Sequence, residues 1–137
     1  MAVYRNDKPD YFLTALHSIY KQTVCPTEII LVVDGPVPTI LNESINTLIA
    51  EIPILKIIRL KENKGHAFAR QTGLDAATNN LVAMMDSDDI SVYERFEKQL
   101  KAFEEHPDVS VVGGIINEFI RNPENIVGKR QVPEYDD

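Results

Sequence analysis

Three acidic side chains follow an apolar run in the middle of the chain. Residues 81–91 read LVAMMDSDDIS, so that Asp86, Asp88 and Asp89 come directly after five apolar residues. Carboxylates this close repel one another and are costly to bury. Hard divalent cations such as Mg²⁺ and Mn²⁺ prefer carboxylate oxygens, and two acids one residue apart in a turn can point at one site. The D-x-D spacing of Asp86 and Asp88 therefore indicates a divalent-cation site.

The same acids also have a purely structural interpretation. Ser91 and Glu94 have the S-x-x-E spacing of a capping box at the head of a helix. Asp88 and Asp89 precede that cap, where the helix dipole favours negative charge. Three carboxylates exceed what one cap requires, so we assign Asp89 and Ser91 to the helix start. Asp86 and Asp88 remain the candidates for the cation.

The elements that must position these acids alternate along the chain. Short β-branched runs have the length of buried parallel strands, and between them apolar residues recur at helical spacing. The expected strands are 1–4, 28–33, 54–60, 81–85 and 109–112, with edge strands at 115–120 and 126–132, and the expected helices are 9–22, 41–52, 66–78 and 92–105. This alternation predicts a Rossmann-like α/β fold with a mostly parallel sheet, right-handed crossovers and helices on both faces.

Ligands of such sheets bind beyond the carboxyl ends of the strands. Besides the acids already named, the residues that follow these ends are Tyr4, Arg5, Asp34, Gly35, Asn63 and Lys64. Lys64 and Arg70 bring cationic groups to an otherwise acidic edge. Taken alone, Arg70 is better explained by an ion pair on a helix surface, and Asp34 by a turn before Gly35.

Composition limits the classes of function. The chain has 137 residues, 44% hydrophobic and 26% charged, which is typical of one soluble globular domain. Its net charge of −7 argues against nucleic acid and anionic lipid as partners. No apolar run approaches the roughly 20 residues of a membrane span, and a single cysteine, Cys25, provides no disulfide framework. We therefore expect a cytoplasmic location.

Four segments together resemble the nucleotide-binding half of the family 2 inverting glycosyltransferases, whose fold is called GT-A. They are MAVYRND with the following helix end HSIYKQT, EIILVVDG, NKGHAFARQTG, and LVAMMDSDD followed by a helix. They occur in the family's order and at similar spacing over about residues 1–115. The resemblance implies metal-dependent transfer of a sugar from a nucleoside-diphosphate donor to an acceptor hydroxyl, with inversion, and Mn²⁺ or Mg²⁺ as the cofactor.

The resemblance also implies roles for single residues. Asp34 would contact uracil or another base of the donor, with UDP-sugars favoured, and Tyr4 would lie against the nucleotide. Arg70 would lie near the base and the phosphates, and Lys64 is counted with these donor-binding residues. Asp86 would face the ribose or a metal-bound water, and Asp88 would coordinate the cation directly.

The second half of such enzymes carries the acceptor site and the general base. Nothing in this chain matches that half, and the sequence contains no tryptophan. We therefore expect a truncated GT-A domain over 1–137, with the nucleotide-binding half at 1–115, an incomplete acceptor-side segment at 116–137 and the general base beyond Asp137. The acids that close the chain are better explained as an acidic terminus than as a base; they are Glu134, Asp136 and Asp137. The implied acceptor is a saccharide or lipid-linked saccharide of polysaccharide biosynthesis, with the parent enzyme at the inner face of the membrane.

Two other classes of function stay open beside the transferase. A receiver-type signalling domain has a similar length and an acidic Mg²⁺ pocket, but it needs an acidic pair where this chain has Tyr4-Arg5. A non-catalytic nucleotide-binding module would use the same residues without transferring sugar. The histidines are not at ligand spacing, and we expect His17 and His106 to be structural, whereas His66 borders the predicted site.

Overall fold

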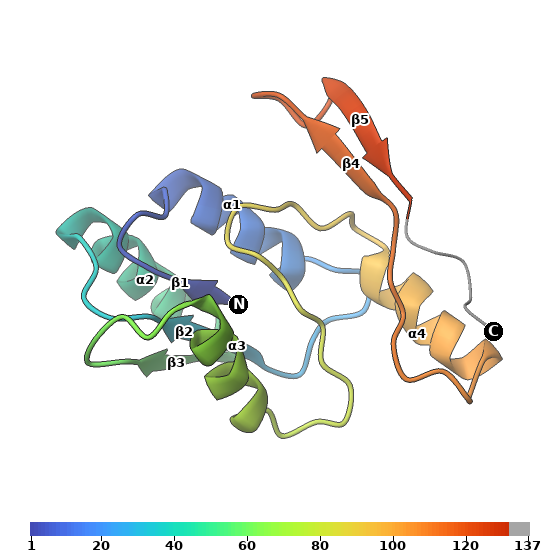
Figure 1. Ribbon diagram of the computed structural model, residues 1–137, viewed down its shortest axis with the longest axis horizontal. Helices are drawn as coiled ribbons and strands as arrows, with labels where there is room; N and C mark the ends of the chain where they lie inside the picture. Colours follow the sequence, from blue (N-terminus) through green and yellow to red (C-terminus); the bar gives the residue numbers. More distant parts are fainter. Residues whose placement is uncertain (132–137) are drawn as a thin grey trace. The chain divides into compact units, whose positions relative to one another are not determined.

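The computed structural model describes residues 1–131 of the chain (Figure 1). The described chain forms two compact units, Met1–Phe96 and the part of Glu97–Asp137 that precedes residue 132. The closing acids named above, Glu134, Asp136 and Asp137, lie outside the described residues. The predicted division into 1–115 and 116–137 stays a prediction.

A parallel three-stranded sheet in the order β1-β2-β3 forms the centre of the first unit. The strands are Ala2–Val3 for β1, Ile29–Val33 for β2 and Leu55–Arg59 for β3. Val33 pairs with Val3 on one side and with Arg59 on the other. All three strands therefore end at the same edge of the sheet, and the predicted parallel α/β class is confirmed.

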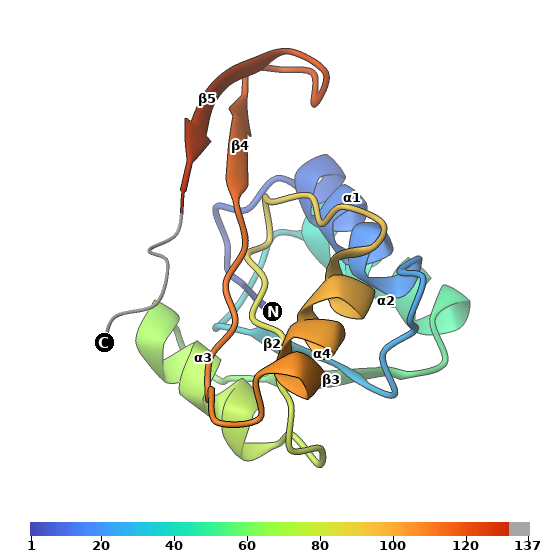
Figure 2. The same cartoon turned by 90° about the vertical axis from the view of Figure 1, so that its right-hand side faces the viewer.

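Helices cover both faces of this sheet (Figure 2). Their bounds are Pro9–Tyr20 for α1, Thr39–Glu51 for α2 and His66–Asp75 for α3. Successive side chains of a strand point to opposite faces, and β2 shows this directly. Leu31 and Val33 are fully buried in the core shared with α1 and α2. Val32 instead faces α3, where a side chain on Gly73 would begin 3.5 Å from its Cγ2.

The predicted buried strand at 81–85 is wrong. The segment has no strand conformation, and only Met85 of its five side chains is buried. A strand needs a neighbour that accepts and donates its backbone hydrogen bonds, and β1 offers only two paired residues. The Arg95 guanidinium provides one of the hydrogen bonds that a neighbouring strand would supply, because its Nη2 donates to the Met84 carbonyl at 3.0 Å.

The predicted capping box at Ser91 is not formed, because α4 is Arg95–Glu105 and begins later than the expected residue 92. Ser91 is buried, and its N–H donates to the Ser18 hydroxyl of α1 at 3.0 Å. The first turn of α4 is capped instead by Gln22, two residues after the end of α1, since the Phe96 N–H donates to its Oε1 at 3.0 Å.

The second unit contains the rest of α4 and a two-stranded antiparallel hairpin. The hairpin strands are Ile116–Phe119 for β4 and Ile126–Arg130 for β5. Strands were expected in both places, but they form a sheet of their own and not the edges of the parallel sheet. The strand predicted at 109–112 is wrong, because the Val109 N–H closes a turn onto the His106 carbonyl at 3.1 Å. Among residues 1–131, no helix has the length and apolar character needed to cross a membrane.

Candidate functional site

A cavity of about 640 Å³ opens at the edge of the sheet where the strands end. Tyr4, Asp34, Asp86 and Asp88, four of the predicted site residues, line it together. The other lining residues are Ala2, Val3, Arg5, Asn6, Asp7, Asn63, Gly65, His66, Ala69 and Ser87. The cavity is therefore built from the segment after β1, the end of β2, the loop before α3 and the D-x-D turn.

Asp34 ties two of these segments together. It is buried, and its two carboxylate oxygens accept hydrogen bonds from the backbone N–H groups of Lys64 at 2.7 Å and Gly65 at 2.9 Å. The Asn63 side chain donates to the Asp34 carbonyl at 3.3 Å. Asp34 is thus the turn acid that the simpler interpretation expected. Because a carboxylate oxygen has two acceptor sites, Asp34 keeps acceptor capacity toward the cavity that it lines.

Gly35 makes the close approach of these two segments possible. Its φ is +83°, in the region that favours glycine, and a Cβ there would lie 2.5 Å from the backbone nitrogen of Asn63. No other residue type fits without moving the loop that carries Asn63 and Gly65.

Arg70 does not line the cavity, but it forms an ion pair with Asp86, which does. Arg70 comes from the second turn of α3, next to the fully buried Ala69. Both partners of the pair are part-exposed, so a ligand can reach them. The ion pair expected for Arg70 as a surface residue is therefore made with one of the two predicted cation-binding acids.

Lys64 contributes to the site through its backbone rather than its ammonium group. Its Nζ pairs with the Glu62 carboxylate, and hydrogen bonding from Lys64 lowers the pKa of Glu62. The Lys64 side chain is absent from the residues that line the cavity.

Asp86 and Asp88 provide two carboxylates for a cation at the cavity. Within residues 1–131, no group of three or more His, Cys, Asp or Glu side chains gathers closely enough to hold a metal ion alone. Mg²⁺ and similar cations commonly use one or two protein carboxylates together with water and substrate phosphates, so two acids fit this mode. The pKa of the neighbouring Asp89 is raised by desolvation first and then by the charges of Asp86 and Asp88.

Among the lining residues that were not assigned to the site from the sequence, Asp7 and Ser87 carry polar side chains that contact each other. Asp7 was taken as part of a turn and helix start, yet its half-buried carboxylate lies in the cavity. Burial raises the pKa of Asp7, against the hydrogen bonds from the Tyr4 N–H and the Ser87 side chain. Ser87 lies between the two acids of the D-x-D turn. Its position in that motif is the only feature of the sequence that could have indicated a place in the site.

The three histidines lie in different surroundings. His66 lines the cavity, as its position next to the predicted site suggested. His17 has its Nε2 3.6 Å from a Glu51 carboxylate oxygen, which links α1 to α2. The His106 N–H donates to the Ala102 carbonyl within the end of α4.

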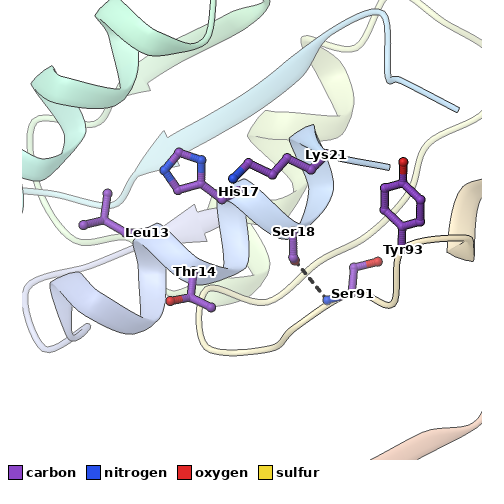
Figure 3. A pocket seen from close by; sticks show the side chains of 7 residues that line it. All are labelled: Leu13, Thr14, His17, Ser18, Lys21, Ser91 and Tyr93. Atoms are coloured by element: carbon purple, nitrogen blue, oxygen red, sulfur yellow. Dashed lines mark hydrogen bonds between the residues drawn. The ribbon is translucent and has the colours of Figure 1, made fainter. Parts of the chain in front are cut away.

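A second cavity of about 500 Å³ lies on the outer side of α1 (Figure 3). It is lined by Leu13, Thr14, His17, Ser18, Lys21, Ser91 and Tyr93. The Ser18 and Thr14 hydroxyls donate to carbonyls of their own helix, and Ser18 also accepts from the Ser91 N–H. The Ser18 hydroxyl thus connects α1 to the segment at Ser91, whereas the Thr14 hydroxyl is bonded within α1.

The sequence matches the family model described as "Glycosyl transferase family 2" over residues 1–135. It is 40% identical over 119 residues to the amylovoran biosynthesis glycosyltransferase AmsE of Erwinia amylovora, covering 87% of this chain and 44% of AmsE. It is 38% identical over 123 residues to UDP-Gal:alpha-D-GlcNAc-diphosphoundecaprenol beta-1,3-galactosyltransferase of Escherichia coli, covering 90% of this chain and 44% of that enzyme. The chain thus spans less than half the length of these relatives.

The fold is similar to that of the mannosyltransferase PcManGT from Pyrobaculum calidifontis, solved in complex with GDP-Man and Mn²⁺. The TM-score is 0.62 at 20% identity, over 90% of this chain and 35% of PcManGT. This likeness confirms the GT-A fold class. The match over residues 1–135 also sets aside the receiver-type signalling domain that the acidic edge had left open.

Proposed function

Because this chain belongs to glycosyl transferase family 2, we propose that it carries the donor site of an enzyme that transfers a sugar from a nucleoside diphosphate to an acceptor hydroxyl with inversion. The observation that carries the proposal is the convergence of Tyr4, Asp34, Asp86 and Asp88 on one cavity from three separate parts of the chain. Parallel α/β sheets bind ligands at this edge.

The nucleotide would be recognised by the segments after β1 and β2. Tyr4 is 41% exposed and lines the cavity, so that a base or ribose can lie against its ring. Asp34 accepts from the backbone of Lys64 and Gly65, which fixes its carboxylate for a further hydrogen bond from a base N–H. Arg70 supplies a positive charge beside Asp86 for the diphosphate.

Asp88 and Asp86 would hold a divalent cation together with the donor phosphates. When bound, such a cation neutralises the charge that develops on the departing diphosphate. The two acids present oxygen ligands only, which suits Mg²⁺ or Mn²⁺ and not a softer metal. PcManGT, of similar fold, was solved with Mn²⁺.

The names of the relatives suggest the substrates. The E. coli relative is named for UDP-Gal and a diphosphoundecaprenol-linked acceptor, and AmsE is named for amylovoran biosynthesis. We accordingly favour a UDP-sugar as the donor and a saccharide or lipid-linked saccharide of polysaccharide biosynthesis as the acceptor, used at the inner face of a membrane. The general base for the acceptor hydroxyl would lie beyond Asp137.

Isothermal titration with UDP and with GDP, with and without Mn²⁺, tests the proposal. We expect the wild type to bind at least one of these nucleotides more tightly with Mn²⁺, and Asp88→Ala to lose that enhancement. Asp89→Ala is the matched control, because it removes an adjacent charge from a side chain that does not line the cavity. If no nucleoside diphosphate binds even with metal, the donor-site proposal is wrong, and if Asp88→Ala keeps the Mn²⁺ enhancement, the metal assignment is wrong.

A further inference from the structure

A third carboxylate, that of Asp7, lies in the cavity beside the D-x-D turn. We propose that Asp7 is a positioning residue that acts through the Ser87 hydroxyl and holds the turn Asp86–Asp88 against the end of β1. Asp88 in particular is thereby kept directed at the donor. This inference rests on the proposed function, since it concerns how the same site is held in its binding conformation.

The carboxylate of Asp7 is itself anchored. The Tyr4 N–H donates to Oδ2 of Asp7 at 2.9 Å, and the Asp7 N–H donates back to the Tyr4 carbonyl at 3.1 Å. This reciprocal pair closes a tight turn directly after β1. The two hydrogen bonds thus fix the Asp7 side chain and leave its second carboxylate oxygen able to accept another hydrogen bond.

The D-x-D turn is held on one side by the ion pair between Asp86 and Arg70. The segment 81–85 that leads into it forms no strand, so no ladder of backbone hydrogen bonds fixes the turn. The Ser87 side chain is a hydrogen-bond partner of Asp7 and lies at the centre of the turn. Asp86 is also held by its ion pair with Arg70, so the attachment of Ser87 acts mainly on the direction of Asp88, which follows it in the chain.

Asp7 does not act as a third ligand of the cation. In the part of the chain that the structure describes, no three acidic, histidine or cysteine side chains come close enough to share a metal ion. Positioning through Ser87 therefore accounts for the place of Asp7 in the cavity better than direct coordination does.

The test compares the affinity for UDP with Mn²⁺ in Asp7→Ala, Ser87→Ala and the double variant. Each single variant is expected to weaken binding about tenfold, as is usual for groups that orient metal ligands, and the double variant no more than either single one. Asp7→Asn keeps an oxygen that can accept from Ser87 and Tyr4, so it should bind nearly as well as the wild type. Asp10→Ala, which removes an exposed carboxylate outside the cavity, is the control.

Three results would overturn the positioning role: unchanged affinity in Ser87→Ala, additive losses in the double variant, or an equal loss in Asp7→Asn and Asp7→Ala. A second measurement needs no ligand and separates this inference from the proposed function. The heteronuclear NOE of the Ser87 and Asp88 amides should fall in Asp7→Ala and Ser87→Ala but not in Asp7→Asn. If the wild type binds no nucleotide, the donor-site proposal fails, and these amides alone decide whether Asp7 holds the turn; an unchanged NOE in Asp7→Ala contradicts it.

Discussion

At the scale of single residues, the backbone of Gly35 determines how closely the segments around the cavity meet. Both Gly35 and Gly65 have positive φ, of 83° and 89°. A Cβ on Gly35 would lie 2.5 Å from the Asn63 nitrogen, whereas a Cβ on Gly65 meets nothing within 4 Å. The two glycines thus share the conformational requirement but differ in the space around them.

This difference predicts unequal effects of alanine. Gly65, with φ of 89° and ψ of 159°, lies in a backbone region that is essentially restricted to glycine, so Gly65→Ala should cost about 1–3 kcal/mol. Gly35→Ala adds a backbone clash to its positive φ and should cost more than Gly65→Ala does. Urea unfolding of both variants measures this, and equal losses of stability would show that the close approach to Asn63 is not needed for folding.

The cavity residues that were predicted from the sequence share one feature of the sequence. Asp34 and Asp86 each follow the end of an apolar run, so the rule for the edges of parallel sheets pointed to them. Asp7 has a comparable place after β1, but its partner Ser87 lies far along the chain, and no local pattern indicates that contact. The sequence therefore predicted four residues that line the cavity, Tyr4, Asp34, Asp86 and Asp88, whereas Lys64 and Arg70 do not line it and the contact between Asp7 and Ser87 was not predicted.

At the scale of elements, packing partners decided which predicted strands formed. The runs that became β2 and β3 pair with each other over five residues. The runs at 81–85 and 109–112 have equally apolar sequences but no ladder partner among the described residues. The apolar pattern of a segment predicts its tendency to form a strand. It does not identify the neighbouring strand that completes its hydrogen bonds, because that strand lies elsewhere in the chain.

The start of α4 depends on Gln22, a buried side chain just after the end of α1. Gln22 donates to the carbonyls of Ser18 and Val92, both at 2.8 Å, and accepts from the Phe96 N–H at 3.0 Å. Gln22→Ala would remove the acceptor of the Phe96 N–H and one donor each from the Ser18 and Val92 carbonyls, of which the Val92 carbonyl keeps the Arg95 N–H, and it should cost about 1–3 kcal/mol. Gln71→Ala, at an exposed position of α3, is the matched control and should be close to neutral. Thermal unfolding of the two variants distinguishes them, and similar midpoints would contradict the capping role.

Glu28, just before β2, links this strand to β3 and to the chain after α3. It accepts from Lys56 Nζ at 2.7 Å and from the Thr78 N–H and the Asn79 side chain, both at 2.8 Å. Hydrogen bonding from Lys56 first, then from Thr78 and Asn79, lowers the pKa of Glu28 from 4.5 to about 2.

A lowered pKa in the folded state stabilises the fold above the unfolded pKa, and this stabilisation is lost as the pH falls. The wild type should therefore lose stability between about pH 4.5 and pH 2. Glu28→Gln should be less stable at neutral pH and show a shallower loss over this range, measured by urea midpoints at each pH. Glu62→Gln, whose lowered pKa depends on Lys64 alone, should flatten the profile less. A Glu28→Gln profile parallel to that of the wild type would contradict this linkage.

At the scale of the whole molecule, the balance of charge bears on the proposed donor site. A net charge of −7 would repel a nucleoside diphosphate, and in our proposal Arg70 and a divalent cation at Asp86 and Asp88 would offset that repulsion locally. The family prediction is confirmed by the match over residues 1–135, and the α/β class followed from the alternation of strands and helices. The chain spans less than half of AmsE and of the E. coli galactosyltransferase, and transfer by the whole protein remains our proposal.

The central claim is that a nucleoside diphosphate binds at the edge where β1 and β2 end. Titration of the ¹⁵N-labelled chain with UDP and Mg²⁺, followed by amide chemical shifts, tests it most directly. We predict saturable shifts that concentrate at Tyr4, Asp34, Gly65 and Asp88, and none beyond background at Ser18 and Tyr93 of the second cavity. Saturable shifts centred on Ser18 and Tyr93, or no saturable shifts with UDP or GDP, would contradict the account.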